Sequence, residues 1–192
     1  VPVEEDNEKS RCVTEEEGLS EDVYAFIAVA PVFSPSFLYA LAVILIKFLI
    51  YSILAVGISE REANFDYFYS NKVQAVKFLL IPVAIAMQED LIHVYAYAAN
   101  LKYDDKVLKD HPDATKSKLV LSLLLRLMDG LFSLSVNFLV MLQTHDSVIQ
   151  VFLNFAALHF LQSIDDVFFV LVTKGFFGEE IEQKSDDCRK VI

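Results

Sequence analysis

Polar and charged residues recur at helical spacing in an otherwise apolar segment, residues 119–143. They are spaced by 4, 3, 4 and 4 positions and are Ser122, Arg126, Asp129, Ser133 and Asn137. Because a helix turns by about 100° per residue, this spacing keeps all five side chains in one narrow stripe. Water cannot satisfy such groups inside hydrocarbon, so we expect the stripe to face other helices or an aqueous cavity.

Two other apolar segments carry polar groups of the same kind. When the segments are placed as helices that cross a membrane alternately, Glu89 lies near the centre, and His93, Arg126 and Asp165 lie within about two turns of the midplane. The sequence therefore predicts one polar layer between three helices, formed by Glu89, Asp90, His93, Arg126, Asp129, Asn137, Asn154, His159, Gln162, Asp165 and Asp166.

The charges of this layer do not balance, because five acids in the apolar segments face only Lys47 and Arg126. Protonated carboxylates, charged His93 and His159, a bound cation or basic groups on a partner subunit would each restore the balance. Two interpretations of the layer stay open. It is either a hydrogen-bond network that fixes helix packing, or a pathway for a cation or a proton.

Motifs for catalysis are absent from the sequence. The Asp90-x-x-His93 pair is half of a carboxylate-bridged di-metal motif, whose second half is missing. The chain has no Gly-rich phosphate loop, no Gly-x-Ser-x-Gly and no His-Glu-x-x-His. We therefore predict no catalytic residue, no metal site and no cofactor, with a bound pigment or cation as the alternative.

Four apolar segments can position the polar layer. They cover about residues 32–58, 73–99, 119–143 and 148–173, and each exceeds the roughly 20 helical residues that cross a hydrocarbon core. The last two are joined by only four residues, which predicts an antiparallel helical hairpin. We expect an all-α fold, a four-transmembrane-helix bundle over residues 31–177, with an acidic N-terminal tail (1–30) and an acidic C-terminal tail (178–192).

Composition agrees with a membrane location. The chain has 192 residues, of which 55% are apolar, and its mean hydropathy is +0.43. A net charge of -11 excludes nucleic-acid binding, which needs a basic surface. Eleven Lys and Arg residues lie in the tails and the loop 101–118, against three on the opposite face. The positive-inside rule therefore predicts both termini on the cytoplasm-like side (cytoplasm, stroma or matrix).

One segment resembles a known group of proteins. Its residues are Asn154-Phe155, Ala157, Ile164-Asp165-Asp166 and Gly175-Phe176. With these residues the segment from Arg126 to Gly178 resembles the last two spans of uncharacterised multi-span membrane proteins of diatoms and other stramenopile algae. The resemblance implies an algal origin and brings no established activity.

Together these features predict a non-catalytic integral membrane protein. The leading hypothesis is an accessory or scaffold subunit of a larger membrane complex, photosynthetic or respiratory complexes of organelles included. Its partners would be the lipid bilayer and other membrane-protein subunits, or further copies of the chain. The alternative is a small oligomeric cation or proton channel or transporter that uses the intramembrane acids. A soluble helical bundle is disfavoured by the apolar run 32–58.

Overall fold

The computed structural model describes residues 21–59, 71–99, 108–109, 111–144 and 147–189, and no strand occurs among them. Residues 1–20 of the predicted N-terminal tail, residues 101–107 and 110 of the predicted loop 101–118, and residues 190–192 lie outside the described residues. The helices are α1 (Val23–Val29), α2 (Pro35–Ser59), α3 (Asn71–Ala86), α4 (Glu89–Ala99), α6 (Lys116–Gln143), α7 (Val148–Gln162), α8 (Ile164–Thr173) and α9 (Glu179–Arg189).

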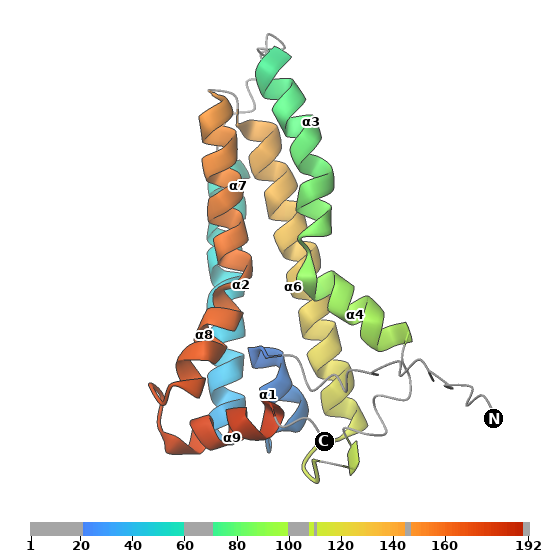
Figure 1. The fold of residues 1–192 in the computed structure, drawn as a ribbon, viewed down its shortest axis with the longest axis vertical. Helices are drawn as coiled ribbons and strands as arrows, with labels where there is room; N and C mark the ends of the chain where they lie inside the picture. Colours follow the sequence, from blue (N-terminus) through green and yellow to red (C-terminus); the bar gives the residue numbers. More distant parts are fainter. Residues whose placement is uncertain (1–20, 60–70, 100–107, 110, 145–146, 190–192) are drawn as a thin grey trace, which may run out of the picture.

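Two long helices, α2 and α6, form the axis of the molecule and run side by side (Figure 1). Each is long and apolar enough to cross a membrane, over Pro35–Ile58 and Lys116–Gln143. The outer face of α2 exposes large apolar side chains at helical spacing, with Leu45, Leu49 and Ile53 each about 60% exposed. Lipid is the environment in which such a surface is stable, so the fold agrees with membrane association.

The other two predicted spans are broken. α7 and α8 are bent by 44° at Ser163, and they make a third candidate span if they are taken together. The segment 73–99 is divided at Met87–Gln88 into α3 and α4, and α4 points away from the bundle axis (Figure 1). The prediction of four regular spans was therefore too simple. In both cases a new helix starts where adjacent acids follow the break, because carboxylates are favoured in the first turn of a helix.

Part of the predicted N-terminal tail belongs to the fold. Residues Val23–Val29 form α1, and every one of its side chains is buried. The Asp22 carboxylate caps this helix by accepting hydrogen bonds from the backbone N–H groups of Tyr24 and Ala25. Seven helical residues rise only about 10 Å, so α1 cannot span a membrane, and its apolar side chains are buried instead against α2 and α6.

The predicted C-terminal tail also folds. After Gly175 and Gly178, both with positive φ, the chain turns and forms α9 across the lower end of the molecule in Figure 1. α9 packs against α1, α2 and α8 through Ile181, Ser185 and Cys188. Most of its acids are turned outward, which explains why the composition of this segment looked like that of a solvated tail.

The packing of α9 is testable at Cys188. The thiol is 2% exposed and burial raises its pKa to about 12. A high pKa leaves little thiolate at pH 8, and thiolate is the reactive form. In a Cys12→Ser variant, which leaves Cys188 as the only thiol, we expect maleimide labelling at pH 8 to be at least tenfold slower in mild detergent than after denaturation. Equal rates would show that α9 does not pack as described.

Candidate functional site

The polar stripe of α6 faces the interior of the bundle, as its spacing predicts. Ser122, Arg126, Asp129, Ser133 and Asn137 are each at most 8% exposed. The Ser122 hydroxyl donates a hydrogen bond to the carbonyl oxygen of Tyr24 (2.9 Å), and the Gln162 amide donates to the Ser133 hydroxyl. The stripe is therefore held by the backbone of α1 and by a side chain of α7.

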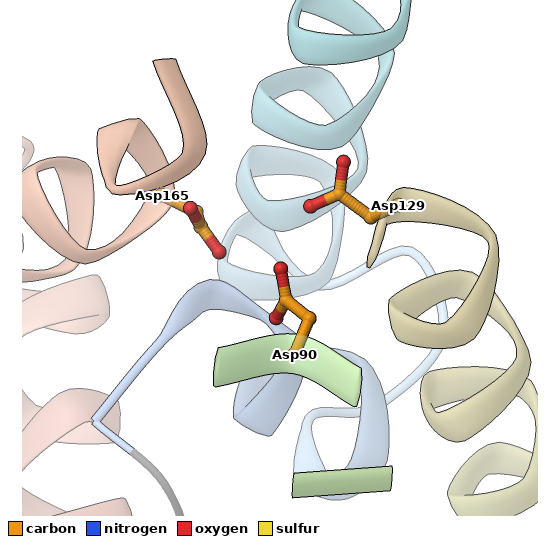
Figure 2. A group of neighbouring side chains, drawn as sticks. All are labelled: Asp90, Asp129 and Asp165. Atoms are coloured by element: carbon orange, nitrogen blue, oxygen red, sulfur yellow. The ribbon is translucent and has the colours of Figure 1, made fainter. Parts of the chain in front are cut away.

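Lys47 of α2 lies at the centre of the site and is 2% exposed. Its Nζ lies 2.5 Å from Asp129 Oδ2, 2.7 Å from Asp165 Oδ1 and 3.9 Å from Asp90 Oδ2. Nζ also donates a hydrogen bond to the carbonyl oxygen of Gln162 at 2.8 Å. Figure 2 shows the three carboxylates pointing toward one another from α4, α6 and α8. We call Lys47, Asp90, Asp129 and Asp165 the lysine–carboxylate cluster.

Three carboxylates this close are also able to hold a metal ion. One oxygen from each of Asp90, Asp129 and Asp165 lies within 4.8 Å of the others. The ammonium of Lys47 contacts the same oxygens, however, so in this conformation it takes the position that a cation would need. No histidine belongs to this group among the described residues.

A second ion pair borders the cluster. The Arg126 guanidinium binds the Asp22 carboxylate, and its Nε lies 3.9 Å from Asp90 Oδ1. The same guanidinium stacks over the ring of Tyr24, with 5.1 Å between Cζ and the ring centroid. Asp90 therefore lies between the two basic side chains and connects the two ion pairs.

Tyr24 joins α1 to the cluster. Its hydroxyl donates a hydrogen bond of 2.8 Å to Asp129 Oδ2. Burial, and then the charge of Asp129, raise the pKa of Tyr24 far above the ordinary value of a phenol. The hydroxyl therefore keeps its proton and acts only as a donor toward the carboxylate.

Acids outnumber bases in the cluster and its immediate neighbours, so their formal charges do not balance. Four carboxylates, those of Asp22, Asp90, Asp129 and Asp165, share the two basic side chains of Lys47 and Arg126. The formal charge is therefore −2. The sequence predicted an excess of three, because its five acids included Glu89 and Asp166 but not Asp22, and it did not show which bases pair with which acids.

A polar pocket of about 190 Å³ opens beside the cluster, at the two places where helices break. Both α4 and α8 begin there and carry two adjacent acids in the first turn, Glu89-Asp90 and Asp165-Asp166. The N-terminus of a helix is a favourable place for negative charge. The pocket is lined by Asp22, Met87, Gln88, Glu89, Asp90, His93, His159, Gln162, Ser163, Asp165 and Asp166.

The predicted single layer is in fact a series of polar groups along the bundle. Asn137 lies two turns beyond Asp129 on α6, a rise of about 12 Å. Asn154 lies near the far end of α6 and donates a hydrogen bond of 2.8 Å to Thr144. These two residues are therefore separate from the cluster. The layer was predicted at one depth because the helices were treated as straight, continuous and equal in length.

Several buried polar atoms in this series have no hydrogen-bond partner among the described residues. They include Tyr51 Oη, Asp129 Oδ1 and Asn137 Oδ1. Tyr51 follows Lys47 by one turn of α2, so its hydroxyl lies beyond the cluster in the direction of Asn137. An unsatisfied buried polar atom costs about 1–3 kcal/mol, which is the kind of cost that functional sites carry.

Sequence reasoning missed two members of the site, Asp22 and Tyr24, and it counted Lys47 in the charge balance without placing it in the polar layer. Lys47 is the single charged residue between Val32 and Ile58. A lone charge inside a span needs a partner, and that signal was present. Asp22 and Tyr24 had no such signal, because they belong to a short segment next to an acidic run.

No family model, curated protein or solved structure matches this chain. The resemblance of the segment from Arg126 to Gly178 to algal membrane proteins therefore stays a prediction. Of the residues that carry it, Asp165 belongs to the lysine–carboxylate cluster, Asp166 lines the pocket, and Gly175 makes a turn with φ of 76°.

Removal of the Tyr24 hydroxyl tests the link between α1 and the cluster. Tyr24→Phe leaves the ring in place but removes the donor to Asp129, and a hydrogen bond to a charged group contributes about 1.5–3 kcal/mol. We expect a lower midpoint of thermal unfolding in detergent. Tyr39→Phe is the control, because Tyr39 donates to the neutral carbonyl oxygen of Phe168. A loss no larger than that of the control would contradict the link.

Gly130 allows α4 to approach α6. A Cβ at this position would lie 2.8 Å from Leu91 Cγ and Cδ2 and 3.4 Å from Asp90 Cβ. We expect Gly130→Ala to push α4 outward, to lower the unfolding midpoint and to weaken any property that depends on Asp90. In a Leu91→Ala background the same substitution has room and is expected to cost much less. Equal effects in both backgrounds would show that the contact with Leu91 is not limiting.

Proposed function

We propose that the protein is a non-catalytic integral membrane protein that binds a cation beside the lysine–carboxylate cluster and passes it along the polar groups of the bundle. A metal cation and a proton both fall within this proposal. The observation that carries it is the excess of acids over bases at a polar pocket, located at the breaks between α3 and α4 and between α7 and α8.

The helix breaks support this proposal. Interrupted membrane helices free backbone groups and bring helix ends to the interior, which is where many transporters bind their substrates. Here the α7–α8 break supplies the carbonyl oxygen of Gln162 to the cluster, and both breaks supply carboxylates.

The polar series along α6 also supports passage of a cation. Ser133 and Asn137 continue the line of the cluster inside the bundle, and Thr144, Asn154 and Gln150 form a hydrogen-bonded group near its far end. Hydroxyl and amide oxygens at successive turns offer a moving cation or a chain of waters a sequence of partners.

An accessory or scaffold subunit remains the second candidate. The sequence supported this candidate through buried acids that a basic partner subunit could neutralise. That support is weaker in the structure, because Lys47 and Arg126 pair with several acids within the chain. A different observation favours it: α4 packs on α6 but tilts away from the bundle axis, and its outer face exposes Ile92 (54%) and Tyr95 (76%). A neighbouring subunit or a second copy of the chain would cover this surface.

The proposed topology uses α3 and α4 together as a broken fourth crossing. An even number of crossings places both ends of the chain on the same side, and the distribution of Lys and Arg favours the cytoplasm-like side. The membrane would be algal if the resemblance of the C-terminal half holds.

Flux through reconstituted protein tests the cation proposal. We expect liposomes that contain the wild-type chain to admit protons, Na⁺ or Ca²⁺, measured with an enclosed indicator dye for each, faster than empty liposomes. Asp165→Asn and Asp90→Asn each remove one carboxylate of the cluster and should reduce the flux at least tenfold. Asp186→Asn on the exposed face of α9 is the matched control and should have no effect.

Two results would contradict the proposal. One is a wild-type flux no greater than that of empty liposomes for all three cations. The other is a flux that survives both cluster substitutions while circular dichroism and size exclusion show folded protein. Co-purification of a stoichiometric partner would then favour the accessory subunit.

A further inference from the structure

The surroundings of Lys47 Nζ match those of a bound hard cation. Its neighbours are oxygen atoms from three carboxylates and one backbone carbonyl, and they come from α4, α6, α7 and α8. Na⁺ and Ca²⁺ prefer the same ligands, namely carboxylate and carbonyl oxygens. α2 therefore inserts an ammonium into a site whose chemistry also suits a metal cation.

The three-carboxylate site is open toward the pocket, and not all of its carboxylate oxygens have a close partner. Asp129 and Asp165 hold Nζ at 2.5 and 2.7 Å, whereas Asp90 is 3.9 Å away and its side chain is 19% exposed. Asp90 and Asp165 both line the pocket, so an incoming cation meets two of the three carboxylates. Asp129 is 1% exposed, and its Oδ1 has no hydrogen-bond partner among the described residues. This oxygen is available as a further ligand.

A displaced ammonium also has an acceptor within reach. Tyr51 lies one turn further along α2 and is 1% exposed, and its hydroxyl has no hydrogen-bond partner in the described part of the chain. Residues four apart on a helix are neighbours on one face. Because lysine has a flexible four-carbon stem, its ammonium can exchange the carboxylates for the Tyr51 hydroxyl without movement of α2.

We propose that the ammonium of Lys47 and a hard metal cation occupy the three-carboxylate site in turn. A cation that enters from the pocket takes Asp90, Asp129 and Asp165 as ligands, and Lys47 moves toward Tyr51. When the cation leaves, Lys47 returns, so the buried carboxylates always have a counter-charge. This inference rests on the proposed function, because it describes how the same site would be filled and emptied.

Substitution of the lysine tests the competition. Lys47→Met keeps an unbranched side chain but removes the competing charge. Isothermal titration of the purified full chain in mild detergent, with Ca²⁺ and with Na⁺, should show at least tenfold tighter binding of one of them than in wild type. The gain should disappear in Lys47→Met/Asp165→Asn. Lys174→Met, which changes an exposed lysine, is the control and should bind as the wild type does.

A second variant keeps the positive charge and guards against a failure of Lys47→Met to fold. Arginine binds carboxylates through a planar fork and remains charged, so Lys47→Arg should leave the site less readily. We expect its cation affinity to fall at least tenfold below that of the wild type. The proposal is overturned if folded Lys47→Met binds neither cation more tightly than wild type, or if Lys47→Arg binds as the wild type does.

The two proposals fail in different ways. Wild-type flux that depends on Asp165, together with unchanged affinity in Lys47→Met, would remove the competition and leave the cation pathway. Tighter binding in Lys47→Met, together with no wild-type flux, would remove the pathway and leave a site at which lysine and metal compete.

Discussion

The structure depends on one constraint: a charge buried among apolar side chains is costly unless an opposite charge lies beside it. Lys47 lies in the middle of the most apolar helix, and it is neutralised there by carboxylates from α6 and α8. Removal of one partner of a buried ion pair costs about 3–5 kcal/mol, because the other charge is left alone. The packing of these helices around α2 is therefore fixed by charge as well as by apolar contact.

The same constraint explains the shape of the rest of the bundle. An unbroken helix from residue 71 to 99 and another from 148 to 173 would run past the cluster as straight rods. The breaks at Met87–Gln88 and at Ser163 instead start new helices beside the cluster, and the first turns of those helices carry Asp90 and Asp165. α1 fills the interior next to the diverging α4 and contributes Asp22 and Tyr24. α1 and the two helix breaks therefore all lie beside the lysine–carboxylate cluster.

The inward face of α6 could be predicted from local sequence patterns, whereas the pairing of distant charges, α1 and the helix breaks could not. The spacing of Arg126, Asp129 and Asn137 determined the inward face of α6, since helical periodicity is a property of nearby residues. The pairing of Asp22 with Arg126 joins residues 104 positions apart, and no local pattern records such a contact. α1 was missed because seven apolar residues are too few to distinguish a buried helix from part of a tail. The helix breaks were missed because hydropathy averages over them.

Excess charge, rather than polarity, is the feature that favours the proposed cation site over an ordinary packing network. A network that only fixed helix positions would be most stable with equal numbers of acids and bases, since each additional carboxylate in a low dielectric environment is unfavourable. Two acids in excess are tolerable only where a proton or another cation reaches them. The polar pocket reaches Asp22, Asp90 and Asp165, but Asp129 is not among its lining residues and is held by Tyr24 and Lys47. Asp129 therefore contacts Lys47 away from the pocket, Asp165 contacts Lys47 and also lines the pocket, and Asp90 lines the pocket at 3.9 Å from the lysine. This graded access is the asymmetry that the proposed reversible binding needs.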